Sequence, residues 1–376
     1  MATLPDSIGG WAALKTLDLS FCGELASLPD SICDLAALTR FDLTGCVTLA
    51  ALPDGIGRLR ELTMLYLTGC WSLTSLPGSI GHLTSLMDFE LDACTALTGL
   101  PDSVVNLAAL TRLNLNFSTA LATLPHRIGD LAALKALFLC ECDNLERLPD
   151  STGDLALLQV LKLADAGISS LPHTIGNLSS LTQLDLRYMR FTGLPDGICG
   201  LTALVSLDLT ESALTALPEG IGALAALTHL ILKCCPQLAA LPDSIGDLAA
   251  LVYLDAHGCG ALTRLPDGMG RARTLRALLL GSCTRLAELP GSLCDLVALE
   301  RLDLSACELL THLPERMGEL VRLTSLDLTG CSGLLSLPGG LRTLRRLPRI
   351  DVVGCADAVR LQAKTPLQDD DFDASK

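Results

Sequence analysis

Apolar residues recur along the chain in a fixed order, and the stretch from Leu38 to Gly57, LTRFDLTGCVTLAALPDGIG, shows that order in full. Leu38, Phe41 and Leu43 occupy its first, fourth and sixth positions, and polar residues flank the last two. An alternation of apolar and polar residues is typical of a strand with one buried face. The pattern therefore predicts a short strand at about 40–44.

The segment after this strand follows a different period. A Leu-Pro pair comes first, and the apolar residues Ile56, Leu59 and Leu62 then recur every three positions. Three-residue spacing favours a short helix or a 3-10 turn. The proline lacks the amide that a continuous strand would need, and we expect interior glycines such as Gly57 to keep the helical segments short.

Copies of this unit follow one another along almost the whole chain. The prolines of the Leu-Pro pair are 24 residues apart, except near the middle, where the period is 23. They are Pro5, Pro29, Pro53, Pro77, Pro101, Pro125, Pro149, Pro172, Pro195, Pro218, Pro242, Pro266, Pro290, Pro314 and Pro338. Such a period indicates stacked repeats with one continuous core. We expect a single elongated α/β solenoid of about fifteen repeats over residues 1–355, with parallel strands on one side and helical turns on the other.

The two ends of the array differ from its middle. The chain begins within a repeat, at the Leu-Pro half, and we expect the native protein to continue upstream and cover the first layer. Residues 356–376 are expected to form a C-terminal cap and a tail. Within them, 356–363 are predicted to form a helical turn, and the acidic run Asp369 to Asp373 is predicted to be disordered.

Composition narrows the classes of function. Aromatic residues make up only 3% of the chain, so the core must be built from leucine and alanine. The formal net charge of −15 argues against nucleic acid and an anionic membrane surface as partners, because both require concentrated Lys and Arg. No signal-peptide pattern and no run of 18 apolar residues occurs. We therefore predict a cytoplasmic protein with a protein or peptide partner; the oligomeric state stays open.

Sixteen cysteines are present, and eleven of them occupy the ninth position of the repeat, from Cys22 to Cys355. A thiol repeated in register is best explained as a small reduced group buried under each turn. Because no C-x-x-C spacing occurs, we expect no metal site and no cofactor. The cysteine also marks a longer turn, since the repeats with Ala166, Met189 or Ser212 at this position have a turn one residue shorter.

The repeat L-x-x-L-x-L-x-x-C-x-x-L-x-x-L-P-x-x-I-G-x-L-x-x-L closely resembles the leucine-rich repeat of the plant-type intracellular class, as in nucleotide-binding disease-resistance receptors. It is also similar to Ras-associated leucine-rich-repeat scaffolds and to effectors that plant-pathogenic bacteria inject. The resemblance covers residues 1 to about 355. It implies a curved horseshoe with the parallel sheet on its concave face and short helices or 3-10 turns on its convex face. It also implies a scaffold or recognition module that grips a protein on the concave face, in innate immunity or signalling.

Other functions remain open on the sequence. The chain is alternatively a bacterial effector that docks host proteins, or the substrate-recognition arm of a larger enzyme, such as a ubiquitin ligase or kinase, with catalysis elsewhere. Within the chain itself, Ser206, His229 and Asp255 on neighbouring strands are the residue types of a catalytic triad, but a flat sheet offers no oxyanion donors. We therefore expect no enzymatic activity.

Side chains that point outward from the strands differ between repeats, so we seek the function there. In the middle of the chain these positions bring aromatic and basic residues together on neighbouring repeats, and such residues are the usual anchors of interfaces. The predicted protein-binding residues are Arg112, Phe117, Phe138, Lys162, Arg187 and Tyr188.

The central outward position is acidic in nine repeats, and it forms a ladder of Asp303, Asp327 and Asp351 near the C-terminus. Like charges opposite one another on adjacent strands repel, so this ladder is a candidate site for a basic partner segment. Alternatively, Leu-Asp-Leu is only the pattern of a soluble strand, partly neutralised by arginines such as Arg301 and Arg349.

Overall fold

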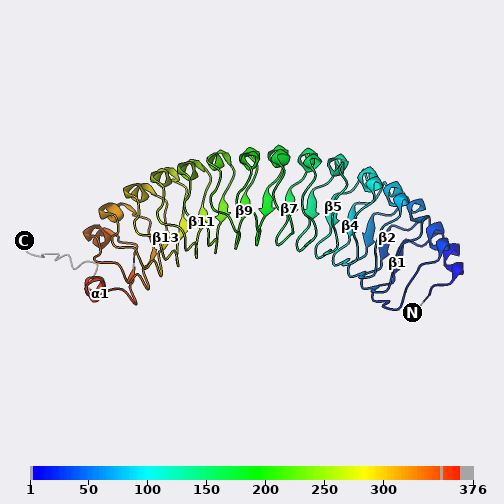
Figure 1. Cartoon of the computed structure of the whole chain (residues 1–376), viewed down its shortest axis with the longest axis horizontal. Helices are drawn as coiled ribbons and strands as arrows, with labels where there is room; N and C mark the ends of the chain where they lie inside the picture. Colours follow the sequence, from blue (N-terminus) through cyan, green and yellow to red (C-terminus); the bar gives the residue numbers. More distant parts are fainter. Residues whose placement is uncertain (1–2, 348–349, 365–376) are drawn as a thin grey trace, which may run out of the picture. The chain divides into compact units, whose positions relative to one another are not determined.

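The computed structural model describes residues 3–347 and 350–364. They belong to two compact units, the first ending at Phe191 and the second beginning at Thr192. Each unit is a stack of similar layers, and each layer contains one short strand and one 3-10 helix (Figure 1). The single domain expected over residues 1–355 stays a prediction.

In the first unit, strands and 3-10 helices alternate along the chain. The strands are β1 (Thr16–Asp18), β2 (Arg40–Asp42), β3 (Met64–Tyr66), β4 (Asp88–Glu90), β5 (Arg112–Asn114), β6 (Ala136–Phe138), β7 (Val160–Lys162) and β8 (Gln183–Asp185). The 3-10 helices are η1 (Asp6–Gly10), η2 (Asp30–Asp34), η3 (Ile56–Arg58), η4 (Gly78–His82), η5 (Asp102–Asn106), η6 (Ile128–Asp130), η7 (Asp150–Asp154) and η8 (His173–Asn177).

The second unit repeats this order and ends in a helix. Its strands are β9 (Ser206–Asp208), β10 (His229–Ile231), β11 (Tyr253–Asp255), β12 (Ala277–Leu279), β13 (Arg301–Asp303), β14 (Ser325–Asp327) and β15 (Ile350–Asp351). Its helices are η9 (Asp196–Gly200), η10 (Ile221–Ala223), η11 (Asp243–Asp247), η12 (Asp267–Arg271), η13 (Gly291–Asp295), η14 (Glu315–Glu319), η15 (Gly339–Thr343) and α1 (Asp357–Lys364). Helix α1 begins one residue later than predicted, and the acidic run Asp369 to Asp373 lies outside the described residues.

Neighbouring strands within each unit pair in parallel and in register, so that Leu17 lies beside Phe41 and Phe41 beside Leu65. The predicted architecture of parallel strands and 3-10 turns is confirmed. The strands are shorter than predicted; β2, for example, ends at Asp42 and not near residue 44. Its carboxylate accepts a hydrogen bond from the amide of Thr44 (Oδ1 to N, 3.1 Å), which turns the chain at that point.

Ten of the eleven repeated cysteines are buried beneath the turns, as predicted, whereas Cys22 is partly exposed, and the ten also make a bond that the sequence did not indicate. The Cys46 thiol donates to the backbone carbonyl of Leu19 in the preceding layer (Sγ to O, 3.3 Å), which links the two layers. Ser118, which replaces cysteine in one repeat, makes the same bond to Leu91 (Oγ to O, 3.1 Å). The other thiols that do so are Cys70, Cys94, Cys142, Cys235, Cys259, Cys283, Cys307, Cys331 and Cys355.

Glycines in the 3-10 helices have a second role, which was not inferred from the sequence. A Cβ at Gly81 would collide with the backbone carbonyl oxygen of Ser103 in the next layer. The same holds at Gly129, where the backbone oxygen of Ser151 occupies the space. These glycines therefore allow the close approach of successive layers, in addition to limiting helix length.

Thr152 in the first unit is a fully buried residue whose polar group has no partner; the buried hydroxyl oxygens of Ser31, Ser79 and Ser103 in the same unit also lack one. Thr152 occupies the position that is apolar in the other repeats; it is fully buried, and its hydroxyl makes no hydrogen bond. A buried hydroxyl without a partner costs about 1–3 kcal/mol. We expect Thr152→Val to keep the shape of the side chain and to remove this cost. The free energy of unfolding should therefore rise by about 1 kcal/mol, which a higher urea midpoint would show.

Thr174→Val is the matched control in the next repeat. Its hydroxyl donates to the carbonyl of Asp150 (Oγ1 to O, 2.6 Å), so this change should lower the midpoint. If both variants moved the midpoint in the same direction, the unpartnered hydroxyl would not be the cause.

Candidate functional site

Phe138 is the centre of a cluster on the outward face of the sheet in the first unit. It ends β6 and is half-buried. The guanidinium carbon of Arg112, from β5, lies 4.8 Å from the centroid of its ring, and the Lys162 ammonium, from β7, lies 5.7 Å from it. Both distances are in the range of cation–π attraction. The structure thus brings three of the six predicted residues into contact.

Arg112 is also held by acids, which the sequence analysis did not foresee. It forms an ion pair with Glu90, and its Nη1 lies 3.5 Å from Oδ1 of Asp88. Asn114 donates to the same glutamate (Nδ2 to Oε2, 2.6 Å). Arg112 is therefore fixed in place above the sheet, and much of its charge is neutralised.

The network continues toward the N-terminus. The Tyr66 hydroxyl donates to Asp88 (O to Oδ2, 3.3 Å), and the guanidinium carbon of Arg40 lies 4.6 Å from the Tyr66 ring centroid. Burial, and after it the carboxylate of Asp88, raises the pKa of the Tyr66 phenol, so that it stays a donor. The outward face from β2 to β7 thus carries alternating cations, rings and acids.

Lys162 differs from the arginines of this face. No ion pair is found for it within the part of the chain that the structure describes, although it lies beside Asp185 in the strand register. Arg187 instead pairs with that carboxylate through two hydrogen bonds (Nε to Oδ1, 2.9 Å; Nη2 to Oδ2, 2.8 Å). Of the predicted cations, Lys162 therefore offers a charge that no carboxylate of the described residues neutralises by an ion pair.

Phe117 and Tyr188 lie in the turns that follow β5 and β8, and not on the strands. Their side chains are 42% and 43% exposed, and their backbones have positive φ values of 56° and 63°. The structure does not place them on the strand face with Phe138. They are two separate exposed rings on the turn edge of the first unit, three repeats apart.

The left-handed backbone at these two residues belongs to a column that recurs in every repeat. Glycine fills it at Gly45, Gly69, Gly258, Gly330 and Gly354. Other residues fill it at Phe21, Ala93, Phe117, Glu141, Asp165, Tyr188, Glu211, Cys234, Ser282 and Ala306. A non-glycine residue there costs roughly 1 kcal/mol. This conformation has no clear signal in the sequence, because glycine occupies the position in a minority of the repeats.

The acidic ladder is present, because Asp303 lies beside Asp327 and Asp327 beside Asp351 in the register. However, the first two carboxylates also hold their own turns. Asp303 accepts the amide of Ser305 (2.9 Å), and Asp327 accepts the amide of Thr329 (2.9 Å). The same bond is made at Asp18, Asp42, Asn114, Asp185, Asp208 and Asp255. The aspartates thus have a structural role that sequence reasoning missed, and a basic partner for the ladder stays a prediction.

The triad of Ser206, His229 and Asp255 does not form. Ser206 lies beside His229 in the register, but the next residue in that row is Tyr253. Asp255 accepts the Tyr253 hydroxyl (3.2 Å), while Nδ1 of His229 lies 2.8 Å from the hydroxyl of Thr228. The imidazole therefore has neither the acid nor the orientation that a triad requires.

Within ranges 3–347 and 350–364, no cluster of three or more His, Cys, Asp or Glu side chains has the arrangement of a metal site. In the same ranges, no helix has the length and apolar character needed to cross a membrane.

Sequence and structure comparisons identify the fold. A model of the leucine-rich repeat region matches residues 123–212, and a leucine-rich repeat model matches residues 13–35. A solved leucine-rich-repeat protein from Leptospira interrogans has a TM-score of 0.67 and 29% identity, over 96% of each chain. The fold is a leucine-rich-repeat solenoid. The finer resemblance to the plant-type intracellular class stays a prediction.

Two other solved structures share the leucine-rich-repeat fold. In the Drosophila Toll–Spätzle complex, the match has a TM-score of 0.65 and 19% identity, over 91% of this chain and 46% of that chain. An internalin from Listeria monocytogenes gives a TM-score of 0.56 and 16% identity, over 93% and 89%. At these identities the likeness shows the fold alone. No curated protein sequence matches the chain.

Proposed function

We propose that this leucine-rich-repeat solenoid is a protein-interaction module that binds a protein or peptide across the outward face of β5 to β7. The observation that carries the proposal is Phe138, which is held by Arg112 at 4.8 Å and Lys162 at 5.7 Å. Aromatic and arginine side chains dominate binding energies at interfaces. Because the two cations already order the ring, a partner would not have to immobilise it on binding.

The comparisons support this proposal at the level of fold. The Toll structure is of a complex with Spätzle, so a leucine-rich-repeat chain of similar fold has a protein ligand there. The resemblance seen in the sequence puts the sheet on the concave face, and we propose that face for binding here. On that resemblance we also propose a cytoplasmic setting in innate immunity or signalling, without a nucleic-acid or membrane partner.

A second candidate setting is that of a bacterial protein that docks host proteins. The 29% identity with the Leptospira protein, over 96% of each chain, favours it. Genomic sequence on both sides of the coding region would distinguish the two settings. A nucleotide-binding module would indicate innate immunity, and a bacterial secretion signal would indicate the bacterial setting.

The test is affinity purification with mass spectrometry, which compares the wild type with the Phe138→Ala, Tyr188→Ala double variant. A specific protein should be captured by the wild type and lost by the variant. With that protein isolated, we expect Phe138→Ala alone to weaken binding about 30-fold, as for an anchor worth about 2 kcal/mol.

Trp71→Ala is the matched control, since Trp71 is an aromatic residue with 57% exposure that lies in a turn outside β5 to β7. It should leave capture unchanged. If Phe138→Ala lowered the free energy of unfolding by several kcal/mol and left capture intact, the ring would be a packing residue and the proposal would be wrong.

A further inference from the structure

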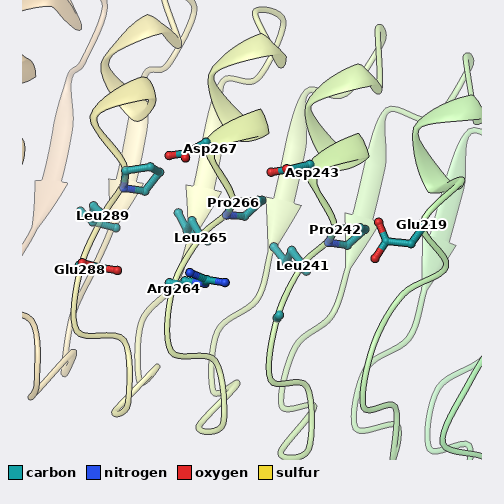
Figure 2. Close-up of a pocket in the computed structure, with 12 residues that line it drawn as sticks. Glu219, Leu241, Pro242, Asp243, Arg264, Leu265, Pro266, Asp267, Glu288 and Leu289 are labelled. Atoms are coloured by element: carbon teal, nitrogen blue, oxygen red, sulfur yellow. The ribbon is translucent and has the colours of Figure 1, made fainter.

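A groove of about 470 Å³ lies in the second unit and is lined by none of the residues of the proposed binding face. It crosses the segments that lead from the turns to η11, η12 and η13 (Figure 2). Its floor is formed by the Leu-Pro pairs of three successive repeats, Leu241-Pro242, Leu265-Pro266 and Leu289-Pro290. Leu241 and Leu265 are only 5% and 3% exposed, so the floor is closely packed and rigid.

One rim of the groove is a row of acids. Glu219, Asp243 and Asp267 each follow the proline of their repeat, and all three are exposed. Together with Asp196 they form the longest uninterrupted run of acids at this repeat position. Asp243 accepts the amide of Gly268 (Oδ1 to N, 3.1 Å), but among the described residues no cation forms an ion pair with any acid of the rim.

The opposite wall consists of Arg264 and Glu288, which are paired by an isolated parallel bridge. Figure 2 shows both side chains below the leucines of the floor. Most repeats have a small residue at this position, two before the proline: Thr3, Ser27, Ala51, Ser75, Gly99, Thr123, Ser170, Gly193, Ala216, Ala240 and Ser336. The two long side chains therefore give this part of the array a wall that most repeats lack.

The charges of the groove favour a cationic ligand. Four carboxylates against one guanidinium leave a formal charge of −3. Like charges on adjacent repeats repel one another, so a cation that bridges them is stabilised. The half-buried Pro266, Leu289 and Pro290 leave apolar surface for the aliphatic stems of lysine and arginine, whose charged ends would reach the rim.

We propose that this groove binds a segment of a partner protein in the polyproline II conformation that carries lysine or arginine at every third position, because three residues make one turn of that helix and put these side chains on one face. Adjacent rungs are about 4.8 Å apart, so Glu219 and Asp267, two rungs apart, are separated by about 10 Å, which is close to the rise of one three-residue turn of polyproline II, about 9 Å. Basic side chains three positions apart therefore meet the two outer acids. The site is distinct from the Phe138 cluster and does not depend on the proposed function.

The probe is a fluorescein-labelled peptide of Lys-Ala-Ala repeated three times, and its binding is measured by fluorescence anisotropy at low ionic strength. The Glu219→Gln, Asp267→Gln double variant should bind it about five- to tenfold more weakly, as expected for the loss of two exposed charge pairs. Asp243 is kept, because its carboxylate holds the backbone. Arg264→Ala should tighten binding about two- to threefold, because it removes a repulsive charge.

The matched control is Asp30→Asn, Asp150→Asn, which removes the same charge from the same repeat position outside the groove. It should leave probe binding unchanged, as should Phe138→Ala. Equal losses in both double variants would mean diffuse attraction to an acidic chain, and would overturn the proposal. So would the absence of probe binding, or equal affinity for a Glu-Ala-Ala peptide.

A second copy of the chain is the competing occupant, because Arg342, Arg345 and Arg346 form an exposed basic cluster. Sedimentation of the protein alone at rising concentration tests it. Self-association that the Glu219→Gln, Asp267→Gln variant abolishes would overturn the proposed partner.

Discussion

At pH 8 four of the sixteen cysteines of the native protein are expected to react with iodoacetamide faster than the deeply buried ones, although burial also raises the pKa of Cys140 and Cys199 among the four. The four are the partly exposed Cys22, Cys140, Cys199 and Cys234. The thiolate is the reactive form, and burial raises the pKa of Cys70, Cys142 and Cys283 to about 12. Relative to a pKa of 9, this lowers the thiolate fraction about a thousandfold. Mass spectrometry of labelled peptides from native and urea-unfolded protein measures the difference. Labelling of native Cys70 as fast as Cys140 would contradict it.

The same thiols are expected to destabilise the fold at high pH. Above about pH 9 the unfolded chain releases thiol protons that the folded chain retains, so the free energy of unfolding falls as the pH rises toward 12. Each such thiol contributes up to about 1.4 kcal/mol per pH unit in that window. The urea midpoint at pH 7, 9 and 10.5 measures this loss. Cys70→Ser should reduce the slope, because a serine hydroxyl does not titrate in this pH range, and Ser118 shows that a hydroxyl can keep the same bond.

Gly81→Ala is expected to destabilise the protein by about 3 kcal/mol, at the upper end of the range for overpacking. Its added methyl group would meet the backbone oxygen of Ser103, and two layers cannot separate locally without loosening the leucines between them. The midpoint of urea unfolding, followed by circular dichroism, measures the loss. The midpoint itself is compared, because repeat arrays do not always unfold in two states.

Gly78→Ala provides the control within the same helix η4. No atom lies within 4 Å of the place that its Cβ would take, so the substitution should be neutral or slightly stabilising. Similar losses in the two variants would show that glycine matters there for backbone conformation and not for the close approach of layers.

The sequence sufficed for those features that depend on one repeat alone. Leu38, Phe41 and Cys46 could be placed in the core, because a strand or turn buries its own residues in a fixed order. The sequence did not show that Asp42 holds its turn, because the same Leu-Asp-Leu pattern fits a merely soluble strand. Nor did it show the left-handed backbone of Phe117, where the usual glycine is absent.

Contacts between repeats were harder to predict. Arg112 lies beside Ala136 in the register and reaches Phe138 diagonally, so the cation–π contact depends on side-chain direction and not on repeat position. The ion pair of Arg187 likewise lies within its own repeat, although the sequence suggested a cation open to a partner. The groove at Arg264 could not be predicted without knowing that the Leu-Pro segments of successive repeats lie side by side.

The unpartnered hydroxyl of Thr152 has a mechanical consequence. Layers of a solenoid touch only their neighbours, so tension along the stack is carried in series and opens first at a weak layer. Thr152 belongs to η7, which connects β6, with Phe138, to β7, with Lys162. A partner bound to both of these side chains would bridge that layer from outside and hold it closed. The force needed to pull the first unit apart would then be higher when the sheet face is occupied.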